Sequence, residues 1–173
     1  MANNYFFTGE KGIGKSTIIN ALCDKFGFKT GGFKTIKNVN DDKSESFHII
    51  NISKNEIPNK ENLLFYRCKN KNEEDIISKF NKFSDALDDY IEYDIIIMDE
   101  IGPNENKAEI FKKKILEILD SDKFVIGVLQ EADTDFINQI KNRKDTKIFT
   151  VTNENRNIIK EIILGIKNEE SKQ

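Results

Sequence analysis

Residues 9–16 have the clearest potential for chemistry in this sequence, because they read Gly-Glu-Lys-Gly-Ile-Gly-Lys-Ser. Glycines at this spacing can adopt positive φ without a Cβ clash, so consecutive backbone N–H groups can turn toward one anion. A short aromatic strand begins before them at Tyr5, and a helix with an apolar stripe follows and ends at Gly27. The N-terminal dipole of that helix would add positive charge. The segment therefore predicts a loop that binds phosphate groups.

Two side chains of this loop suit the phosphates of a nucleotide and the metal ion that accompanies them. Lys15 is placed to reach the β- and γ-phosphates, and the Ser16 hydroxyl to ligate Mg²⁺, which keeps most of its waters. The alternative interpretation is a glycine-rich turn with an exposed lysine, and the strand-loop-helix setting argues against it. The residues predicted to bind nucleotide here are Gly9, Glu10, Lys11, Gly12, Ile13, Gly14, Lys15, Ser16 and Thr17.

A second reactive pair, Asp99 and Glu100, ends the apolar run at residues 93–98. Such a run is typical of a central parallel strand that is buried on both faces. Carboxylates at its carboxyl end would lie in the crevice where open α/β sheets bind ligands, beside the phosphate loop if the two strands are neighbours. We expect Asp99 to hold Mg²⁺ and Glu100 to orient or deprotonate an attacking water. The alternative is a charged strand end that simply reaches solvent.

The elements that must position these residues alternate between strand and helix patterns. This alternation predicts a three-layer α/β fold with a mostly parallel central sheet. Strands are expected at 28–36, 46–53, 63–67, 93–98, 124–129 and 147–151, and helices after the loop and at 73–91, 105–120, 133–142 and 153–166. The strands at 46–53 and 63–67 are expected to form a small antiparallel hairpin insertion.

Composition limits the remaining possibilities. The chain has 173 residues, of which 38% are apolar and 33% charged, and a net charge of −3. We expect one domain at 1–167 and a polar tail at 168–173. This net negative charge does not favour binding to nucleic acid or to an anionic membrane. The absence of a leader pattern and of an apolar run of transmembrane length predicts a cytoplasmic protein, with its oligomeric state open.

Cysteine and histidine offer little further chemistry. Cys23 and Cys68 match no metal-binding spacing, and Cys23 lies on the apolar stripe of the first helix, so both are expected to be reduced core thiols. His48 is the only histidine and lies among apolar residues, so we expect a histidine whose hydrogen bonds are satisfied within the sheet.

Four segments together resemble the THEP1 type of small nucleoside triphosphatase: residues 8–16, 31–35, 96–102 and 151–156. The first is shared by all P-loop proteins, whereas the others in this order are more selective. The resemblance implies a RecA-like P-loop NTPase fold that hydrolyses ATP, GTP and other nucleotides with Mg²⁺ and little base preference. It also implies that the loop binds phosphates and that a second segment faces the γ-phosphate, namely Asp99, Glu100, Ile101 and Gly102.

The sequence departs from that family after Gly102. Members usually continue with Lys-Met-Glu-Leu, whereas this chain has Pro103-Asn104-Glu105-Asn106 and keeps only the glutamate. Residues 34–38 contain lysines where the family more often has acidic residues. These changes bear on the substrate spectrum rather than on the phosphate chemistry.

Arginine is scarce, which matters because an arginine can stabilise the charge that develops in phosphoryl transfer. The sequence has only Arg67, Arg143 and Arg156. The resemblance favours a nucleotide-facing Arg156, and the alternative is a weak surface ion pair. We expect Arg143 to be a solvated helix end rather than a charge-stabilising finger.

Three classes of function share such a loop. A hydrolase would pass the γ-phosphoryl group to water, with Lys15 and Mg²⁺ neutralising charge and Glu100 positioning the water. A small-molecule or nucleotide kinase would need an acceptor pocket and usually an arginine-rich lid, and the few arginines argue against it. A nucleotide-dependent switch or assembly module fits the Asp99-x-x-Gly102 spacing, but the guanine-specific Asn-Lys-x-Asp is missing. We favour the hydrolase.

Overall fold

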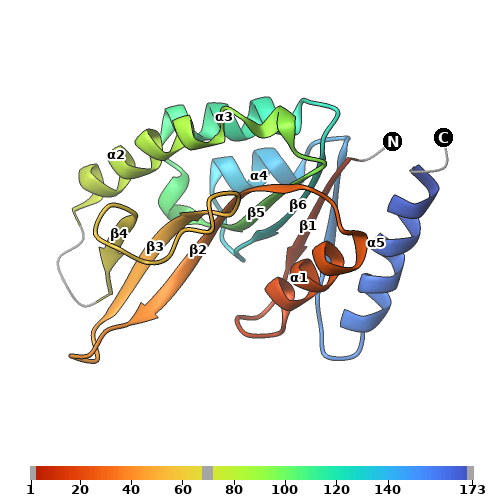
Figure 1. Ribbon diagram of the computed structural model, residues 1–173, viewed down its shortest axis with the longest axis horizontal. Coiled ribbons are helices and arrows are strands. Elements are labelled where there is room, and N and C mark those ends of the chain that lie inside the picture. Colours follow the sequence, from red (N-terminus) through yellow and green to blue (C-terminus); the bar gives the residue numbers. More distant parts are fainter. Residues whose placement is uncertain (1–2, 68–71, 171–173) are drawn as a thin grey trace.

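The computed structural model describes residues 3–67 and 72–170, and within this part seven strands form one sheet in the order β4-β3-β2-β5-β6-β1-β7 (Figure 1). β2, β5, β6, β1 and β7 run parallel, whereas β3 and β4 continue the sheet in antiparallel fashion. The strands are β1 (Asn4–Thr8), β2 (Thr30–Val39), β3 (Glu45–Asn51), β4 (Leu63–Tyr66), β5 (Ile95–Ile101), β6 (Phe124–Leu129) and β7 (Thr146–Thr150). The predicted α/β fold with an antiparallel hairpin is confirmed.

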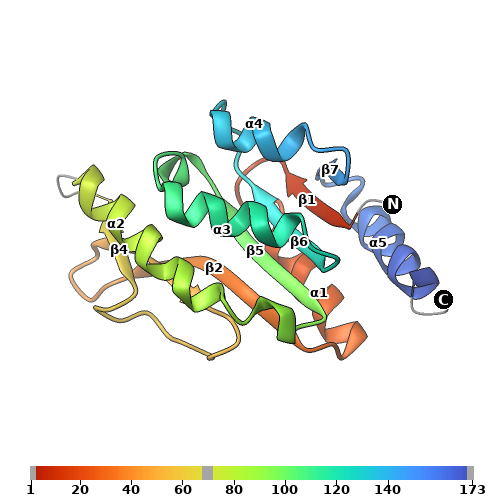
Figure 2. The same cartoon turned by 90° about the horizontal axis from the view of Figure 1, so that it is seen from above.

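Helices cover both faces of this sheet, which makes the three layers (Figures 1 and 2). One face carries α2 (Glu73–Phe83), α3 (Glu109–Leu119) and α4 (Asp135–Lys141). The other carries α1 (Lys15–Phe26) and α5 (Arg156–Glu170). The two ends of the described chain lie side by side at one edge of the molecule (Figures 1 and 2).

The alternation of side chains along each central strand explains why both faces need a cover. In β1, Phe6 packs into the cluster under α2, α3 and α4, whereas Tyr5 and Phe7 pack against α1 and α5. In β5, Ile96 and Met98 face the first cluster and Ile95 and Ile97 the second. All of these seven residues except Tyr5 and Ile97 are completely buried, so the sheet is a rigid base for residues at its carboxyl edge.

The strands that precede the two motifs are not neighbours, which was the condition for placing Asp99 and Glu100 beside the phosphate loop. β6 lies between β1 and β5, so the strand before the phosphate loop and the strand before Asp99 are not adjacent. Gly127 permits this arrangement, because a Cβ there would lie 2.5 Å from the Phe6 ring and 2.7 Å from the Met98 carbonyl oxygen. The two motifs must therefore meet across the end of β6 instead of along a shared strand pair.

Several helix bounds also differ from expectation. The pattern at 73–91 is not one helix: α2 ends at Phe83, and the 3₁₀ turns η1 (Ser84–Leu87) and η2 (Tyr90–Glu92) follow. The pattern at 105–120 begins with the 3₁₀ turn η3 (Pro103–Glu105), so α3 starts later. Apolar residues continue at helical spacing in both cases, because turns that follow the sheet surface bury the same side as a helix would. α5 begins later than expected and continues to Glu170.

No helix in the described ranges, 3–67 and 72–170, has both the length and the apolar character needed to cross a lipid bilayer. The expected division into a domain and a polar tail at 168 stays a prediction.

Candidate active site

The loop between β1 and α1 has the backbone geometry that its glycines predict. Gly9, Gly12 and Gly14 adopt φ values of 126°, 83° and 104°, in the region that other residues rarely enter. α1 starts directly after Gly14, whose carbonyl accepts the Ile18 N–H at 3.0 Å. A Cβ on Gly9 would lie 2.6 Å from the Val151 carbonyl oxygen, so the connection between β7 and α5 packs against the loop.

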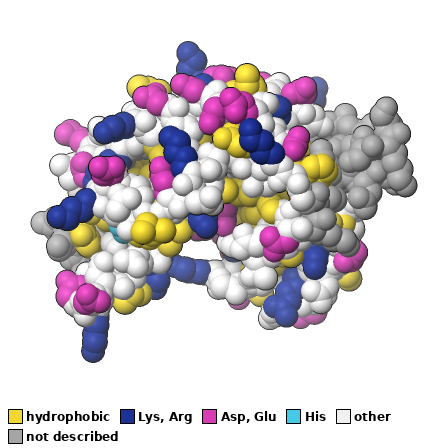
Figure 3. Space-filling model, viewed as in Figure 1, with side chains coloured by type: hydrophobic (Ala, Val, Ile, Leu, Met, Phe, Trp, Pro, Cys, Tyr) yellow, Lys and Arg dark blue, Asp and Glu magenta, His cyan; other side chains and the backbone are white. Residues whose placement is uncertain are grey.

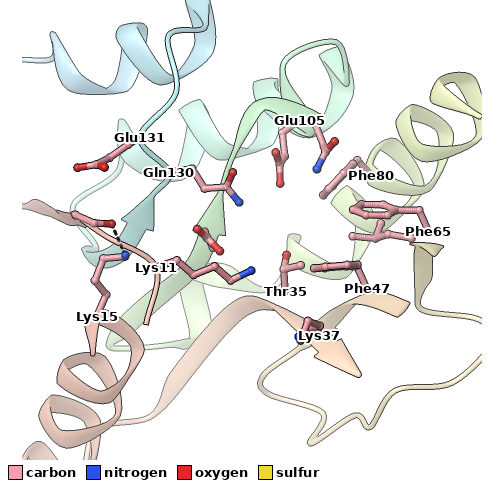
Figure 4. Close-up of a pocket in the computed structure, with 14 residues that line it drawn as sticks. Lys11, Lys15, Thr35, Lys37, Phe47, Phe65, Phe80, Glu105, Gln130 and Glu131 are labelled. Atoms are coloured by element: carbon pink, nitrogen blue, oxygen red, sulfur yellow. Dashed lines mark hydrogen bonds between the residues drawn. The ribbon is translucent and has the colours of Figure 1, made fainter. Parts of the chain in front are cut away.

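The Lys15 ammonium lies folded over this loop. It donates hydrogen bonds to the carbonyl oxygen of Gly9 at 2.6 Å (Figure 4) and to that of Glu10 at 2.8 Å. Phosphate oxygens are stronger acceptors for an ammonium than neutral carbonyls are. The side chain is therefore placed to exchange these contacts for a bound anion without a change in the backbone.

Asp99 reaches the start of α1 although β6 separates the strands. By alternation along β5 it falls on the same face as Ile97, which is the face that α1 covers. The Ser16 hydroxyl lies near the Asp99 carboxylate, and both side chains line the cavity along the loop. Burial raises the pKa of Asp99, and the Ser16 hydroxyl and the ammonium groups of Lys34 and Lys15 oppose that rise. The two predicted metal ligands thus face the same cavity.

Glu100 lies at a break in the regular pattern of β5. The register against β6 shifts between Met98 and Ile101. The side chains of these two residues face the same layer, that of α2 and α3, although two residues lie between them in the chain instead of one. The side chain of Gln130, which follows β6, lies near the Glu100 carboxylate in the larger cavity and lowers its pKa. Burial, followed by the adjacent Asp99 charge, raises the pKa of Glu100.

Glu105 is a third carboxyl group at this edge and the one residue kept from the family pattern after Gly102. It is 3% exposed, and its Oε2 accepts the Gly102 N–H at 3.0 Å. Burial raises the pKa of Glu105 to about 7, with a smaller contribution from Glu100. This contact turns the strand end into η3 and occupies the Gly102 N–H, although the resemblance implies that Gly102 faces the γ-phosphate.

Two cavities meet at these residues. One of about 340 Å³ follows the loop and is lined by Lys11, Gly12, Gly14, Lys15, Ser16, Thr17, Asp99, Glu100 and Val128. A second of about 440 Å³ extends past Glu100 toward β3 and β4 (Figure 4). Figure 3 shows the molecule notched between the β2–β3 lobe and the lobe that contains α1, with basic side chains at the opening. Lys15 and Glu100 line both cavities, so a ligand in one can contact a ligand in the other.

Some predicted site residues lie outside these cavities. Arg156 is the exposed first residue of α5, and its role at the nucleotide stays a prediction. Ile101 is completely buried in the core. Ile13 packs against the core cluster under α1 and α5. Glu10 is exposed and contributes its carbonyl oxygen to Lys15.

Arg143 is not the solvated helix end that we expected. Its side chain is 18% exposed and pairs with Asp120 at 2.7 Å and Asp145 at 2.6 Å. It also donates to the Leu119 carbonyl oxygen at 3.1 Å, so it ties the end of α3 to the turn before β7. These contacts hold its guanidinium at the amino end of β1 and β7, which is the end of the sheet opposite the loop.

The other polar residues singled out earlier are structural. His48 is 5% exposed, and its ring nitrogens contact Asn62 Oδ1 at 3.0 Å and Ser46 Oγ at 2.9 Å, as expected for a satisfied sheet histidine. Cys23 is half-buried, and burial, with Asp24 nearby, raises the pKa of its thiol to about 11. Cys68 lies outside the described residues.

Sequence reasoning missed the residues after β6 and those of the second cavity. Gln130 and Glu131 follow the buried run of β6 just as Asp99 follows that of β5, so the same strand-end signal would have found them. Thr35 and the rings of Phe47 and Phe65 carried no comparable signal, because alternation along an edge strand does not reveal what the exposed face meets.

Comparison with known proteins finds relatives that match nearly the whole chain. A sequence model of the NTPase family matches residues 4–164. The nucleoside-triphosphatase THEP1 of Thermotoga sp. (strain RQ2) is 31% identical, over 92% of this chain and 92% of that protein. THEP1 of Methanocaldococcus jannaschii is 30% identical, over 94% of this chain and 98% of that protein. The crystal structure of THEP1 from Aquifex aeolicus shares the fold, with a TM-score of 0.60 at 24% identity over 94% and 98% of the two chains.

The three-layer fold and the cavity that the loop shares with the Asp99 strand end define a P-loop nucleoside triphosphatase. The chain belongs to the NTPase family, in which its curated relatives carry the name THEP1.

Proposed function

We propose that this protein hydrolyses nucleoside triphosphates to diphosphates and phosphate with Mg²⁺, and that Glu100 positions the attacking water. The observation that supports the proposal is that Ser16 and Asp99 line the same cavity, which brings the loop and the β5 strand end together. Lys15 and Glu100 lie in the same cavity. One bound triphosphate could therefore contact the lysine that compensates its charge, the metal ligands and the carboxylate that positions water.

The donor set at this point fits Mg²⁺. A hydroxyl and a carboxylate are hard oxygen ligands, and Mg²⁺ keeps several waters instead of requiring a cage of protein groups. This agrees with the finding that the described residues hold no cluster of three His, Cys, Asp or Glu side chains. When bound, the ion would neutralise charge on the β- and γ-phosphate oxygens.

The chain's own residues divide the remaining work. Backbone N–H groups of residues 9–16 would bind the phosphates, and Lys15 would exchange its two carbonyl contacts for phosphate oxygens. Glu100, with Gln130 nearby, would accept a hydrogen bond from water and orient it toward the γ-phosphorus. Its raised pKa brings the carboxylate nearer the proton affinity that a general base needs.

The substrate range proposed is broad, covering ATP, GTP and other nucleoside triphosphates. It is supported by the curated relatives, which are named for nucleoside triphosphates in general, and by a sequence that contains no Asn-Lys-x-Asp guanine motif. We also propose a cytoplasmic location, where a reduced Cys23 and such substrates occur together.

A nucleotide panel tests this proposal. Purified protein with Mg²⁺ and no acceptor should release phosphate from several nucleoside triphosphates, and EDTA should stop the release. Lys15→Ala should weaken both nucleotide binding, measured by calorimetry, and turnover, since it removes charge from ground and transition states alike. The control is Lys113→Ala, an exposed lysine on α3. Phosphate release that requires an added acceptor would show that the enzyme is not a hydrolase.

A further inference from the structure

The second cavity has an aromatic end that the hydrolysis of a nucleotide does not use. We call this end the aromatic pocket, formed by Phe47 of β3, Leu64 and Phe65 of β4 and Phe80 of α2. Figure 4 shows its three rings together on the side of the cavity opposite Lys15. We propose that the aromatic pocket binds the planar ring of a second small molecule, an uncharged aromatic alcohol such as a nucleoside, whose hydroxyl group lies at Glu100 and takes the γ-phosphoryl group in place of water.

The aromatic pocket has the shape and surface of a ligand site. The cavity volume of about 440 Å³ is within the range of small-molecule sites. Phe47 and Phe65 lie opposite each other on the paired strands, with ring centroids 4.8 Å apart and ring planes inclined at 19° to each other. Both are half-buried, whereas Leu64 and Phe80 are each 1% exposed and form the floor. Half-exposed rings over an apolar floor favour a flat ring as the occupant.

The occupant cannot be the base of the hydrolysed nucleotide. This step rests on the proposed function, in which the triphosphate lies on residues 9–16 with its γ-phosphate next to Asp99 and Glu100. The base is then at the other end of the triphosphate. A molecule in the aromatic pocket approaches Glu100 from the opposite direction and meets only the terminal phosphate.

The charges around the aromatic pocket favour an uncharged occupant over a phosphorylated one. Lys37 is the basic residue nearest to the rings in the cavity lining, and it pairs with Glu45 at 2.6 Å. Arg67 pairs with the same carboxylate at 2.6 Å, so both cations are already neutralised in part. Lys11 and Lys15 also line this cavity, but they belong to the loop that would bind the triphosphate, so a monophosphate beside the rings would meet only cations that are already paired.

Polar groups between the aromatic pocket and Glu100 suit a hydroxylated molecule. The Thr35 hydroxyl lies in the cavity wall and has no hydrogen-bond partner within the described ranges 3–67 and 72–170. Asn104 and Gln130 line the same stretch, and Gln130 lies near Glu100. These groups can bind the hydroxyls of an acceptor and hold one of them at the carboxylate (Figure 4).

The transfer step balances with the groups present. The acceptor hydroxyl oxygen forms a bond to the γ-phosphorus, and the bond from this phosphorus to the β–γ bridging oxygen breaks. That oxygen keeps the electron pair and leaves on the nucleoside diphosphate. The hydroxyl proton passes to the Glu100 carboxylate, so the products are the diphosphate and a phosphate ester of the acceptor.

Product stoichiometry tests the proposal. The full chain is incubated with saturating Mg-ATP and each of the probes adenosine, guanosine, cytidine and uridine, and ADP, free phosphate and phosphate ester are measured. Hydrolysis alone produces equal ADP and phosphate. We expect at least a twofold excess of ADP over phosphate, matched by ester, with one or more probes, and a return of this ratio toward one in Phe65→Ala.

Phe149→Ala is the matched control. Phe149 is a half-buried ring on β7 at the other edge of the sheet, with its centroid 6.2 Å from that of Phe7. This variant should keep the ADP excess of the unaltered protein. An equal loss in both variants would mean a general effect on folding and would contradict a role for the aromatic pocket.

A binding measurement separates failure of this inference from failure of the proposed function. Each nucleoside is titrated calorimetrically into protein that already holds Mg-ADP, so that the nucleotide site is filled. Equal ADP and phosphate with every probe, with or without binding, would overturn the acceptor role. If the unaltered protein neither binds nor turns over Mg-ATP, the proposed function itself falls, and the transfer with it.

Discussion

Asp99 and Glu100 are neighbours in the chain but have different surroundings, and this difference supports the roles proposed for them. Asp99 faces α1 and lies near Ser16, whereas Glu100 lies at the register shift of β5 and near Gln130. A single carboxylate could not both hold a metal ion and leave lone pairs for water. The pair therefore supplies one anion to each task.

Glu100→Gln tests this division at the level of one residue. The amide keeps the size of the side chain and can still contact water, but it cannot accept a proton. We expect nucleotide binding within about threefold of wild type and a fall in turnover of about 10²–10⁴-fold. Single-turnover phosphate release and calorimetric binding provide the two measurements. Glu92→Gln, at an exposed position, is the control, and a variant that retains more than a tenth of the wild-type rate would contradict the role.

Glu105 predicts a pH dependence of stability. Its pKa in the folded protein is about 7, against a model-compound value of 4.5, because of burial. The folded state then binds more protons than the unfolded state between these values, so its contribution to the free energy of unfolding falls as pH rises from about 4.5 to 7. Glu105→Gln removes this titration but keeps an acceptor for the Gly102 N–H.

The expected result is a difference between two denaturation series. Relative to wild type, the free energy of unfolding of Glu105→Gln should rise by about 3 kcal/mol at most across this pH range. Urea denaturation at half-unit pH steps measures it. Glu109→Gln, at the exposed start of α3, should follow the wild-type curve. If the difference in free energy of unfolding between Glu105→Gln and wild type does not change with pH, Glu105 does not titrate in this range.

At the scale of elements, β6 decides how the site is assembled. It separates β1 from β5 and leads to Gln130, so it both spaces the two motifs and places that side chain near Glu100. Its close packing depends on Gly127, which lies against Phe6 and the Met98 carbonyl. The site is therefore sensitive to a residue in the middle of a strand that has no chemistry of its own.

Two glycine substitutions of opposite effect test the packing of elements. Gly127→Ala adds a methyl group to a filled space, so it should lower the free energy of unfolding by about 1–3 kcal/mol. Gly165→Ala adds one in open space within α5, where alanine should stabilise the helix by about 0.5–1 kcal/mol. Thermal and urea denaturation measure both. A neutral Gly127→Ala would show that β6 can shift between its neighbours.

At the scale of the whole molecule, the nucleotide should stabilise the fold because its site is built from distant parts of the chain. The cavities combine residues of the first loop, the β2–β3 region, the end of β5 and the end of β6. A ligand that bridges them binds the folded state alone. Its binding free energy is therefore added to the stability of the whole chain.

Thermal denaturation with and without Mg-ADP measures this coupling. At about 100 times the dissociation constant, a ligand contributes about 2.7 kcal/mol, which for a chain of this size raises Tm by about 5–10 °C. Chelation of Mg²⁺ by EDTA should at least halve the shift, since it leaves Ser16 and Asp99 without the ion they are proposed to share. A shift that is equal with and without EDTA would argue against metal-dependent binding.

The sequence by itself determined the glycine-rich loop, the pair of carboxylates at the end of a buried strand, and the α/β class. These features depend on local spacing. Residues that are close together in the chain determine both the positive φ of Gly9, Gly12 and Gly14 and the burial of residues 93–98. Only the tertiary structure decided that β6 intervenes between the motifs, that Arg143 ties α3 to the turn before β7, and that an aromatic pocket lies beyond Glu100. Each of these depends on pairing between segments distant in the chain, which local periodicity does not encode.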